Sequence, residues 1–582
     1  MANCIEKFSN ISLAKSVQVA PKQLNFAHSA IQPRQIPSFG SNVLEKFLHN
    51  QGIMAATQVN PVNTVQNHPV YKNDLRTKFK NNEATIMGVI IRTLGAKNSV
   101  GNELIREGDV RGTFINAVDR LDELKELGIN TLHVLPIHPP GKTNAFGTAG
   151  SVYAPADLLK VDPAICDPND PRTPDEQFRY FVDECHKRGI SVMLDLPSCA
   201  SYDLFLARPE LMAFEKDGTP KTPQGWNDIR MFDPWKDETN RELNKELLDY
   251  HIKFAEKCVK DWGVDGVRSD VARTKPTEFW ETMTEYTRKL DPEFAWLAES
   301  YTYEDASPQL NMNYDRPEDC LRSGFDSYYG QYHIFHEWSK ADDLIRYVRE
   351  NINMSQNLDA GKSLIGSFGT HDDISIMNHG GVNFTNLVSG MQATLPMLNP
   401  YYFDGYQSGD DYIYDFEGTT DKQTDTDSEE CTVHRGRPDI FNFSRPLIGD
   451  HPECGDFMKN TLQVRSDARY KDILTKGSFI PLNVDKNKHD QIIAFARHYN
   501  GKTLLVVANR DVNSRQSGVI NIPGMGGNQK LSNLFKSYGE NSEFQVEYGK
   551  VITDLGPGRV HLFEINTPNI ENSGLEVLKQ KL

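Results

Sequence analysis

Residues 263–270 read Gly-Val-Asp-Gly-Val-Arg-Ser-Asp and follow a helical pattern over about residues 239–262. The glycine is a typical helix stop, and the apolar run behind it is typical of a buried strand. The run closes on Arg268 and Asp270, two charged residues at the end of an otherwise mainly apolar segment. A helix followed at once by a buried strand is part of a βαβ unit, so this stretch predicts a parallel sheet.

The same alternation runs through the middle of the chain. Helical spacing over 113–128, 174–188 and 275–290 alternates with short apolar runs of strand length. Those runs are 84–91, 131–137, 190–196, 264–270, 294–299, 363–368 and 400–403. About eight such strands over about 390 residues predict an α/β fold, a (β/α)₈ TIM barrel with insertions. A doubly wound open sheet is the structural alternative.

The flanking segments differ from the barrel pattern. Residues 1–75 are rich in Asn, Gln, Ser and Pro, which predicts a disordered or loosely structured extension. Residues 76–475 form the predicted barrel domain. Beyond it, two apolar runs flank Asn500-Gly501, a hairpin signature. We therefore expect a C-terminal antiparallel β-sandwich over 476–567 and a tail over 568–582.

Composition narrows the classes of partner. The 582 residues include 63 basic and 80 acidic side chains, a formal net charge of −17. That charge disfavours nucleic acid and anionic membranes and suits a neutral substrate such as a sugar. No apolar run is long enough to span a membrane, and residues 1–7 lack the pattern of a secretory signal. The eight cysteines form no C-x-x-C pair, so we expect free thiols in a cytoplasmic protein. The sequence does not specify an oligomeric state.

Charged residues close four of the predicted strands, although a buried parallel strand is normally apolar throughout. They are Asp195, Arg268 with Asp270, Glu299, and His371 with Asp372. In a (β/α)₈ barrel this end of the strands is the active face. Any one of these residues alone fits a structural salt bridge. Because like charges gathered at one rim repel each other, the set as a whole favours a catalytic site.

Two of these carboxyl groups have contrasting surroundings. Arg268 lies two residues before Asp270, so both side chains point the same way, and the arginine should lower the pKa of Asp270 and keep it ionised. Glu299 follows an apolar stretch, and burial would raise a glutamate pKa, which suits a general acid. A pair of carboxyls tuned in opposite directions is the pattern of glycoside hydrolysis.

Four segments resemble the conserved regions of the α-amylase superfamily, glycoside hydrolase family 13. Residues 193–195, 266–272, 296–299 and 368–372 are similar to its first to fourth regions, in that order. The spacings agree in scale, with 75 residues from Asp195 to Asp270, 29 more to Glu299 and 73 more to Asp372. Residues 150–157 are similar to the segment after the second barrel strand. The resemblance covers roughly 84–567.

The resemblance implies roles for individual residues. Asp270 would be the nucleophile, Glu299 the general acid/base and Asp372 the carboxylate that stabilises the transition state. Substrate binding would involve Tyr153, Asp195, Arg268 and His371. Residues 197–238 would form a short domain B between a strand and the next helix.

The chain also departs from the family pattern. Cys199 and Ala200 stand where the first region usually has Asn-His, an asparagine that is often a calcium ligand and a histidine that contacts substrate. We therefore expect no metal and no cofactor. Arg273 and Thr274 replace a frequent Lys-His on the acceptor side, so substrate preference does not carry over. Thr370 replaces the asparagine that usually precedes the histidine of the fourth region.

The predicted function is a retaining glycoside hydrolase of the α-amylase type. It would cleave α-glucosidic bonds in starch- or glycogen-like oligo- or polysaccharides, with an α-glucan as its partner. Three alternatives stay open. They are an α-glucan transglycosylase or disaccharide-converting enzyme of the same family, a non-catalytic carbohydrate-binding member, and an unrelated barrel enzyme that uses Asp and Glu with a divalent metal.

Overall fold

The computed structural model describes residues 71–97, 110–146, 149–223, 226–300, 317–329, 338–363, 368–372, 375–411, 441, 444–527, 529–536 and 543–581. Of the predicted extension over 1–75, only the last five residues fall within this range. The ring of Tyr71 stacks on that of His186, with centroids 3.6 Å apart. The predicted strand over 363–368 lies outside the described residues except for Ser363 and Phe368.

Among the described residues, seven parallel strands form one sheet in the order β10-β9-β8-β3-β2-β1-β11. Their bounds are β1 Ile86–Val89, β2 Thr131–Val134, β3 Ser191–Leu196, β8 Gly266–Ser269, β9 Ala295–Glu299, β10 Ser327–Tyr329 and β11 Tyr401–Phe403. Six strands follow one another in chain order, and β11 pairs with the other edge of β1. On the outer edge of β10, Ser363 forms a parallel bridge with Ser327. A doubly wound sheet would place several successive strands on each side of its first strand, whereas here β11 alone of the sheet's described strands lies on the other side of β1. The TIM-barrel prediction is confirmed, and the strand order disfavours the doubly wound alternative.

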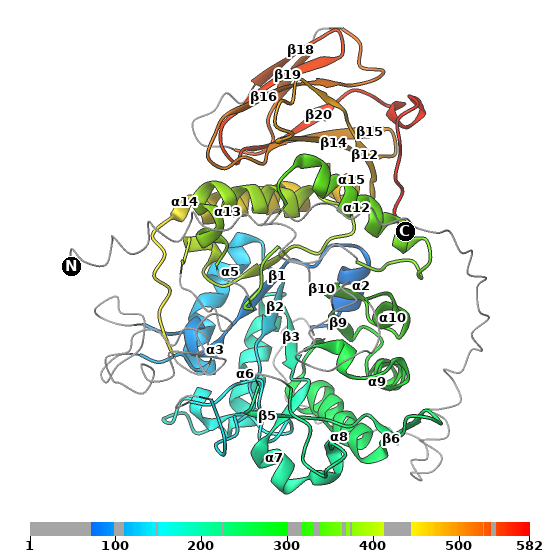
Figure 1. The fold of residues 1–582 in the computed structure, drawn as a ribbon. Helices are drawn as coiled ribbons and strands as arrows, with labels where there is room; N and C mark the ends of the chain where they lie inside the picture. The colour runs from blue at the N-terminus through cyan, green and yellow to red at the C-terminus, as the bar shows by residue number, and fades with distance from the viewer. Residues whose placement is uncertain are drawn as a thin grey trace, which may run out of the picture. The chain divides into compact units, whose positions relative to one another are not determined.

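Helices surround this sheet (Figure 1). They are α2 Leu75–Lys80, α3 Ile91–Leu94, α4 Phe114–Ala117, α5 Leu121–Leu127, α6 Pro174–Lys187, α8 Lys245–Glu256, α9 Thr277–Leu290, α10 Pro317–Arg322, α12 Ala341–Ser355, α13 Ile376–Thr394, α14 Pro452–Ser466 and α15 Lys471–Lys476. Gly128 ends α5 with a φ of 99°, and Gly263 ends the π-helical continuation of α8 with a φ of 69°. Glycine adopts this left-handed conformation without steric cost, so both predicted stops are confirmed.

One predicted helix begins later than expected. The pattern over 239–262 placed its start near 239, whereas α8 begins at Lys245. Asn244 caps it, because its side chain accepts a hydrogen bond from the Leu247 backbone N–H. The preceding residues form a short hairpin instead, with strands β6 Trp235–Asp237 and β7 Glu242–Leu243.

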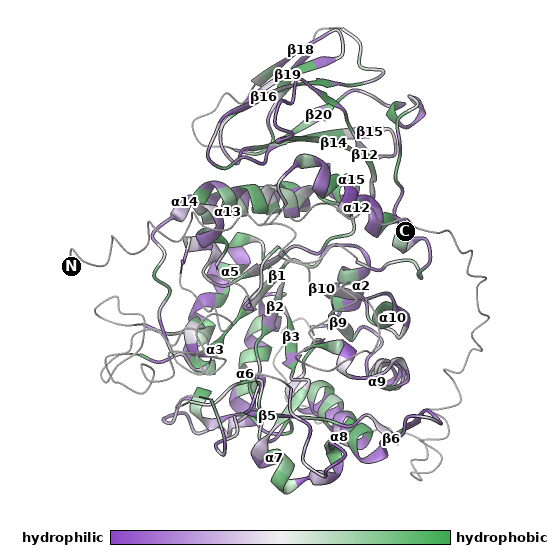
Figure 2. Ribbon diagram, viewed as in Figure 1, coloured by the Kyte–Doolittle hydropathy of each residue, from purple (hydrophilic) through white to green (hydrophobic). Residues whose placement is uncertain are grey.

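The helices carry both polar and apolar residues (Figure 2), and many of the apolar ones are buried. Helix α6, for example, buries Phe178, Phe181, Val182 and Cys185. Burying an aromatic or aliphatic side chain of this size contributes about 1.5–3 kcal/mol. No helix in the described ranges is both long and apolar enough to cross a bilayer.

Between β3 and α8 lies the segment that the resemblance assigns to domain B. It contains β4 Cys199–Ser201, α7 Tyr202–Ala207 and β5 Ile229–Met231, besides the β6–β7 hairpin. Strands β4 and β5 pair antiparallel, with Cys199 opposite Met231. The residues directly after β3 lead into this pair, since β4 begins three residues after Leu196.

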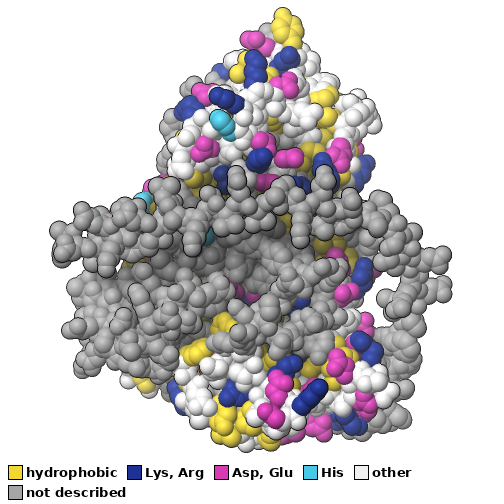
Figure 3. All heavy atoms as spheres, in the orientation of Figure 1, with side chains coloured by type: hydrophobic (Ala, Val, Ile, Leu, Met, Phe, Trp, Pro, Cys, Tyr) yellow, Lys and Arg dark blue, Asp and Glu magenta, His cyan; other side chains and the backbone are white. Residues whose placement is uncertain are grey.

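The described C-terminal strands form two antiparallel sheets, ordered β12-β14-β15-β20 and β13-β16-β19-β18-β17. Their bounds are β12 Ser478–Pro481, β13 Val484–Asp485, β14 Ile492–Tyr499, β15 Lys502–Asn509, β16 Gln516–Asn521, β17 Gln529–Ser532, β18 Glu543–Glu547, β19 Lys550–Leu555 and β20 Val560–Ile565. The predicted turn is confirmed, since Asn500 and Gly501 both have positive φ between β14 and β15. Residues from both sheets share one apolar core, as in a sandwich. Basic and acidic side chains are interspersed on its surface (Figure 3).

Candidate active site

Arg268 lies at the centre of the predicted site because of the strand register. It is the partner of Asp195 across β8 and β3, so the two side chains emerge side by side. A Cβ at Gly266, two residues earlier, would lie 2.7 Å from the Ala295 carbonyl oxygen, so glycine permits close approach to β9. The Arg268 side chain is fully buried.

The Arg268 guanidinium joins the acidic residues that the sequence singled out. Its Nη1 lies 2.7 and 2.9 Å from the two oxygens of Asp195 and 3.1 Å from Oδ1 of Asp270. Its Nη2 lies 2.5 Å from Oε2 of Glu299 and 3.9 Å from Oδ2 of Asp372. The structure therefore brings all four predicted carboxylates to one guanidinium.

Asp270 follows β8 and is held from a second side by Ser198. The Ser198 backbone N–H and hydroxyl donate to Oδ2 of Asp270 at 3.0 and 2.7 Å. Ser198 comes two residues after β3, in the segment where the chain departs from the family pattern. The sequence reading did not single it out, because a serine in a loop carries no distinctive signal.

Glu299, the last residue of β9, also accepts the Val271 backbone N–H at 2.9 Å through Oε2. Val271 adopts a φ of 30° and a ψ of 64°, a left-handed conformation that is rare for a β-branched residue. Such a residue carries a cost of about 1–3 kcal/mol and persists only where its surroundings enforce it. Here the strained turn aims a backbone donor at the candidate acid/base.

Tyr153 and His371 form one wall of the site. Their rings are stacked at 5.5 Å, and the Tyr153 hydroxyl lies 2.6 Å from Nε2 of His371 and 2.9 Å from Oδ2 of Asp195. Nε2 of His371 also lies 3.2 Å from Oδ1 of Asp372. Phe441 packs edge-on against the His371 ring at 5.5 Å, a contact that the sequence reading missed.

His133 is a further buried residue that the sequence reading missed. It lies in β2, with Nε2 3.1 Å from Oδ2 of Asp195 and Nδ1 2.8 Å from the hydroxyl of Tyr401. The signal was available, since His133 is a polar residue within a predicted buried strand. Attention to polar residues anywhere in a buried strand, and not only at its end, would have found it.

Electrostatics distinguishes the carboxylates. Burial alone would raise the pKa of Asp195, but the Arg268 guanidinium and the His133 ring outweigh it and bring the pKa to about 2. Asp195 is therefore ionised at neutral pH. Burial and the positive charge of Arg268 lower the pKa of His371 well below its usual value, so this ring is neutral.

Arg268 lowers the pKa of Asp270 as expected, but the expected net result, a lowered pKa, was wrong. Burial, followed by the charges of Glu299 and Asp195, raises the pKa of Asp270 to about 7, although Arg268 opposes the shift. The main reason is burial, and the guanidinium offsets it only in part because its shortest contacts are to Asp195 and Glu299. Burial and the charge of Glu299 likewise raise the pKa of Asp372 well above its usual value.

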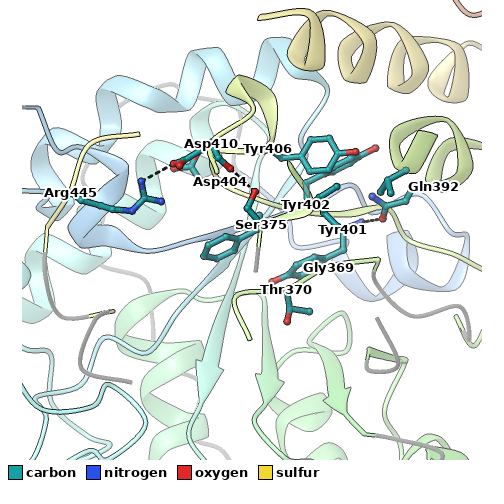
Figure 4. A pocket seen from close by; sticks show the side chains of 14 residues that line it. Gly369, Thr370, Ser375, Gln392, Tyr401, Tyr402, Asp404, Tyr406, Asp410 and Arg445 are labelled. Carbon is teal, nitrogen blue, oxygen red and sulfur yellow. Dashed lines mark hydrogen bonds and ion pairs between the residues drawn. The ribbon is translucent and has the colours of Figure 1, made fainter. Parts of the chain in front are cut away.

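A small cavity is lined by Tyr401, which contacts His133, and by Thr370, which precedes His371 (Figure 4). Its volume is about 40 Å³, and its lining includes the buried ion pair between Arg445 and Asp410, 2.8 Å apart. Sites for small molecules usually measure about 300–1,000 Å³. This cavity suits a few water molecules and is too small for a sugar ring.

The donors around Cys199 do not suit calcium, which takes six to eight oxygen ligands. Burial raises the pKa of the Cys199 thiol to about 12, so it stays protonated. The ammonium of Lys275 lies 3.1 Å from the carbonyl oxygen of Ser198, the residue before Cys199, and its positive charge would repel a calcium ion there. In the described ranges, no group of three or more His, Cys, Asp and Glu side chains could hold a metal ion.

Calcium removal is therefore expected to leave the unfolding temperature unchanged. The protein would be dialysed against EDTA and melted with and without added calcium, with magnesium as the control ion. A fall in Tm on EDTA treatment that calcium alone reverses would contradict this prediction.

Curated relatives match parts of the chain. It is 25% identical over 441 residues to a cyclomaltodextrinase of Thermoanaerobacter pseudethanolicus, covering 71% of this chain and 65% of that protein. It is 32% identical over 210 residues to an alpha-1,4-glucan:maltose-1-phosphate maltosyltransferase of Myxococcus xanthus, covering 34% of this chain and 31% of that protein. It is 27% identical over 232 residues to an intracellular maltogenic amylase of Bacillus subtilis, covering 37% and 36%. No family model matches the chain.

Solved structures share the fold over most of the chain. A maltogenic alpha-amylase from Thermotoga neapolitana gives a TM-score of 0.61 at 19% identity, covering 84% of this chain and 99% of that one. An alpha-amylase from Lactobacillus plantarum gives 0.60 at 20% identity, covering 84% and 99%. These relatives and the shared fold support a relationship to the α-amylase superfamily. The chain spans 65% of the length of the cyclomaltodextrinase and about a third of the maltosyltransferase that it matches.

Proposed function

We propose that this chain is a retaining glycoside hydrolase of the α-amylase superfamily that cleaves α-glucosidic bonds in starch- or glycogen-like glucans. The observation that carries the proposal is the gathering of Asp195, Asp270, Glu299 and Asp372 around the buried Arg268 guanidinium. Repulsion among so many carboxylates makes them unfavourable as a purely structural feature. The names of the curated relatives support an α-glucan as substrate.

In the proposed first step, Glu299 protonates the glycosidic oxygen while a carboxylate oxygen of Asp270 attacks the anomeric carbon. The bond to the leaving sugar breaks, and a covalent β-glycosyl ester forms on Asp270. Oε2 of Glu299 accepts hydrogen bonds from Arg268 and Val271, so we assign the transferred proton to Oε1. Asp372 stabilises the positive charge that develops on the sugar.

In the second step, water attacks the anomeric carbon, and Glu299 takes up the proton that the water releases. The ester bond to Asp270 breaks, and the α-configuration is retained. A retaining enzyme requires the two carboxyls about 5–5.5 Å apart. Tyr153, His371, Asp195 and Arg268 are the proposed substrate contacts, and the neutral His371 can donate to a sugar hydroxyl.

Transglycosylation by the same residues is the second candidate. Sequence identity to a maltosyltransferase is 32%, which is higher than the 25% to the cyclomaltodextrinase. The maltosyltransferase match, however, covers only 34% of the chain. Water and a sugar hydroxyl are alternative acceptors for one covalent intermediate, so the carboxylates alone do not choose between them.

A metal-dependent barrel enzyme is disfavoured by the same site. The guanidinium of Arg268 stands between the carboxylates that would have to hold the cation, and its charge would repel one. For location we propose the cytoplasm. The six cysteines in the described part are buried and free, as expected in a reducing compartment.

Incubation with maltooligosaccharides, cyclomaltodextrins and maltose 1-phosphate tests the proposal, with product chromatography and anomer-resolved NMR. Hydrolysis is expected to give only shorter products, first released as α-anomers. Products longer than the substrate would favour the transferase candidate. No reaction with any α-glucan, or β-anomers as first products, would contradict both.

A further inference from the structure

Lys275 is a buried lysine that lies beside the candidate nucleophile, between a short 3₁₀ turn and helix α9. Its exposed fraction is 1%. Within the described chain, its ammonium donates to two neutral oxygens, the Ser198 carbonyl at 3.1 Å and the Thr274 hydroxyl at 3.3 Å. Aromatic rings surround it, with Nζ 5.3 Å from the ring centroid of Phe232 and 5.8 Å from that of Trp280. Burying a cation costs free energy unless the charge is paired and hydrogen-bonded.

Ser198 links this lysine to Asp270. The Ser198 carbonyl accepts from Lys275, while the Ser198 N–H and hydroxyl both donate to Oδ2 of Asp270. The serine is thus held at its carbonyl and directed at the carboxylate by its two donors. Outer partners that orient a reacting group in this way commonly matter for activity.

We propose that Lys275 is a positioning residue for Asp270: its ammonium anchors Ser198 so that both Ser198 donors stay aimed at the carboxylate, and its fixed charge favours the ionised form. The inference rests on the proposed nucleophilic role of Asp270. Lys275 lies three residues after the segment 266–272 that resembles the family's second region, so the resemblance gives it no role.

The groups facing Lys275 set the sign of its effect. Burial lowers the pKa of Lys275 to about 8, and the nearby Cys199 and Asp270 oppose that shift, so the lysine is mainly protonated at pH 7. From helix α8 it faces His251, whose pKa burial and then Lys275 lower to about 3, so that ring is neutral. The remaining charge beside the ammonium is that of Asp270, which the ammonium stabilises. Removing the ammonium should therefore make Asp270 harder to ionise.

The test compares Lys275→Met with wild type on the α-glucan that wild type turns over best. We expect kcat to fall about 10–100-fold with KM nearly unchanged, since Lys275 acts through Ser198. The acid limb of the kcat/KM profile should move upward, because Asp270 loses a favourable charge. Loss of packing alone would not move that limb.

Lys362→Met is the matched control. Lys362 is partly buried, its pKa is also lowered by burial to about 8, and it donates to the Phe325 carbonyl. The carboxylates that oppose this shift are those of Asp326 and Asp359, not Asp270. Its kcat and acid limb should match those of wild type. If Lys275→Met does not fold, Ser198→Ala tests the positioning role in its place. We expect this variant to have a lower kcat and an acid limb that moves upward in the same way.

A kcat within twofold of wild type together with an unmoved acid limb, in Lys275→Met or in Ser198→Ala, would overturn the proposed positioning role. A wild-type protein with no turnover on any α-glucan would instead overturn the proposed function and this inference with it.

Discussion

Asp270→Asn is expected to lower kcat on α-glucans by at least about 10⁴-fold while the protein stays folded. The reason is chemical, because a carboxamide cannot form the glycosyl ester on which the proposed mechanism depends. Steady-state kinetics with a maltooligosaccharide measures the loss, and circular dichroism checks the fold. Asp217→Asn, in an exposed turn, is the matched control and should keep full activity. Near-normal turnover by Asp270→Asn would remove Asp270 as nucleophile.

The same variant has an expected signature in stability. The pKa of Asp270 is raised in the folded state, so the folded protein binds more protons than the unfolded chain between about pH 4 and pH 7. The contribution of Asp270 to wild-type stability should therefore fall as pH rises through that window. Asp270→Asn lacks this term, so its Tm relative to wild type should increase from pH 4 to pH 8. A relative Tm that is flat across this range would show that Asp270 ionises normally.

Arg268→Met is expected to destabilise the folded state by about 3–5 kcal/mol, the range measured when one partner of a buried ion pair is removed. The fully buried guanidinium binds Asp195 through Nη1 and Glu299 through Nη2, and methionine leaves both carboxylates without it. Urea unfolding at pH 7 measures the effect. Arg268→Lys should fall between wild type and methionine, because a single ammonium cannot reproduce a planar fork.

The pH dependence of this defect follows from Asp195. Its folded pKa is lowered to about 2, so its stabilising contribution is present above about pH 4 and is lost as pH falls toward 2. The difference in free energy of unfolding between wild type and Arg268→Met should therefore become smaller at acid pH. Arg346→Met, which removes an exposed pair with Asp343, is the control and should cost less than about 1 kcal/mol. Equal costs for the two variants would contradict the central role of Arg268.

Sequence patterns predicted the barrel well because they report local chemistry. Glycine stops such as Gly128 and Gly263 and the Asn500-Gly501 turn depend on backbone conformations that few other residues adopt, and all occur as expected. The start of α8 was missed by several residues. The residues between Trp235 and Leu243 are all polar, so no apolar period marks where the helix starts, and the pairing of β6 with β7 decides that this stretch is not helical.

The candidate site was predicted unevenly. Carboxylates at strand ends are visible in sequence because they interrupt apolar runs, and Arg268 meets Asp195, Asp270 and Glu299 as the barrel order requires. Ser198 and Lys275 were not found. They lie outside the strands, and their relation to Asp270 depends on how the loops after β3 and β8 fold back on each other.

The sequence by itself determined which residues carry charge at the strand ends, in what order and on how many strands. These properties follow from hydrophobic periodicity and from chain direction. The tertiary structure decided which carboxylates share the Arg268 guanidinium and how closely each one contacts it. A single guanidinium contacts several carboxylates, so it lowers the pKa of Asp195 while that of Asp270 rises. These pKa values depend on burial, on repulsion between carboxylates and on one shared cation. All three are set by distances between segments that are far apart in the chain, and sequence spacing does not give those distances.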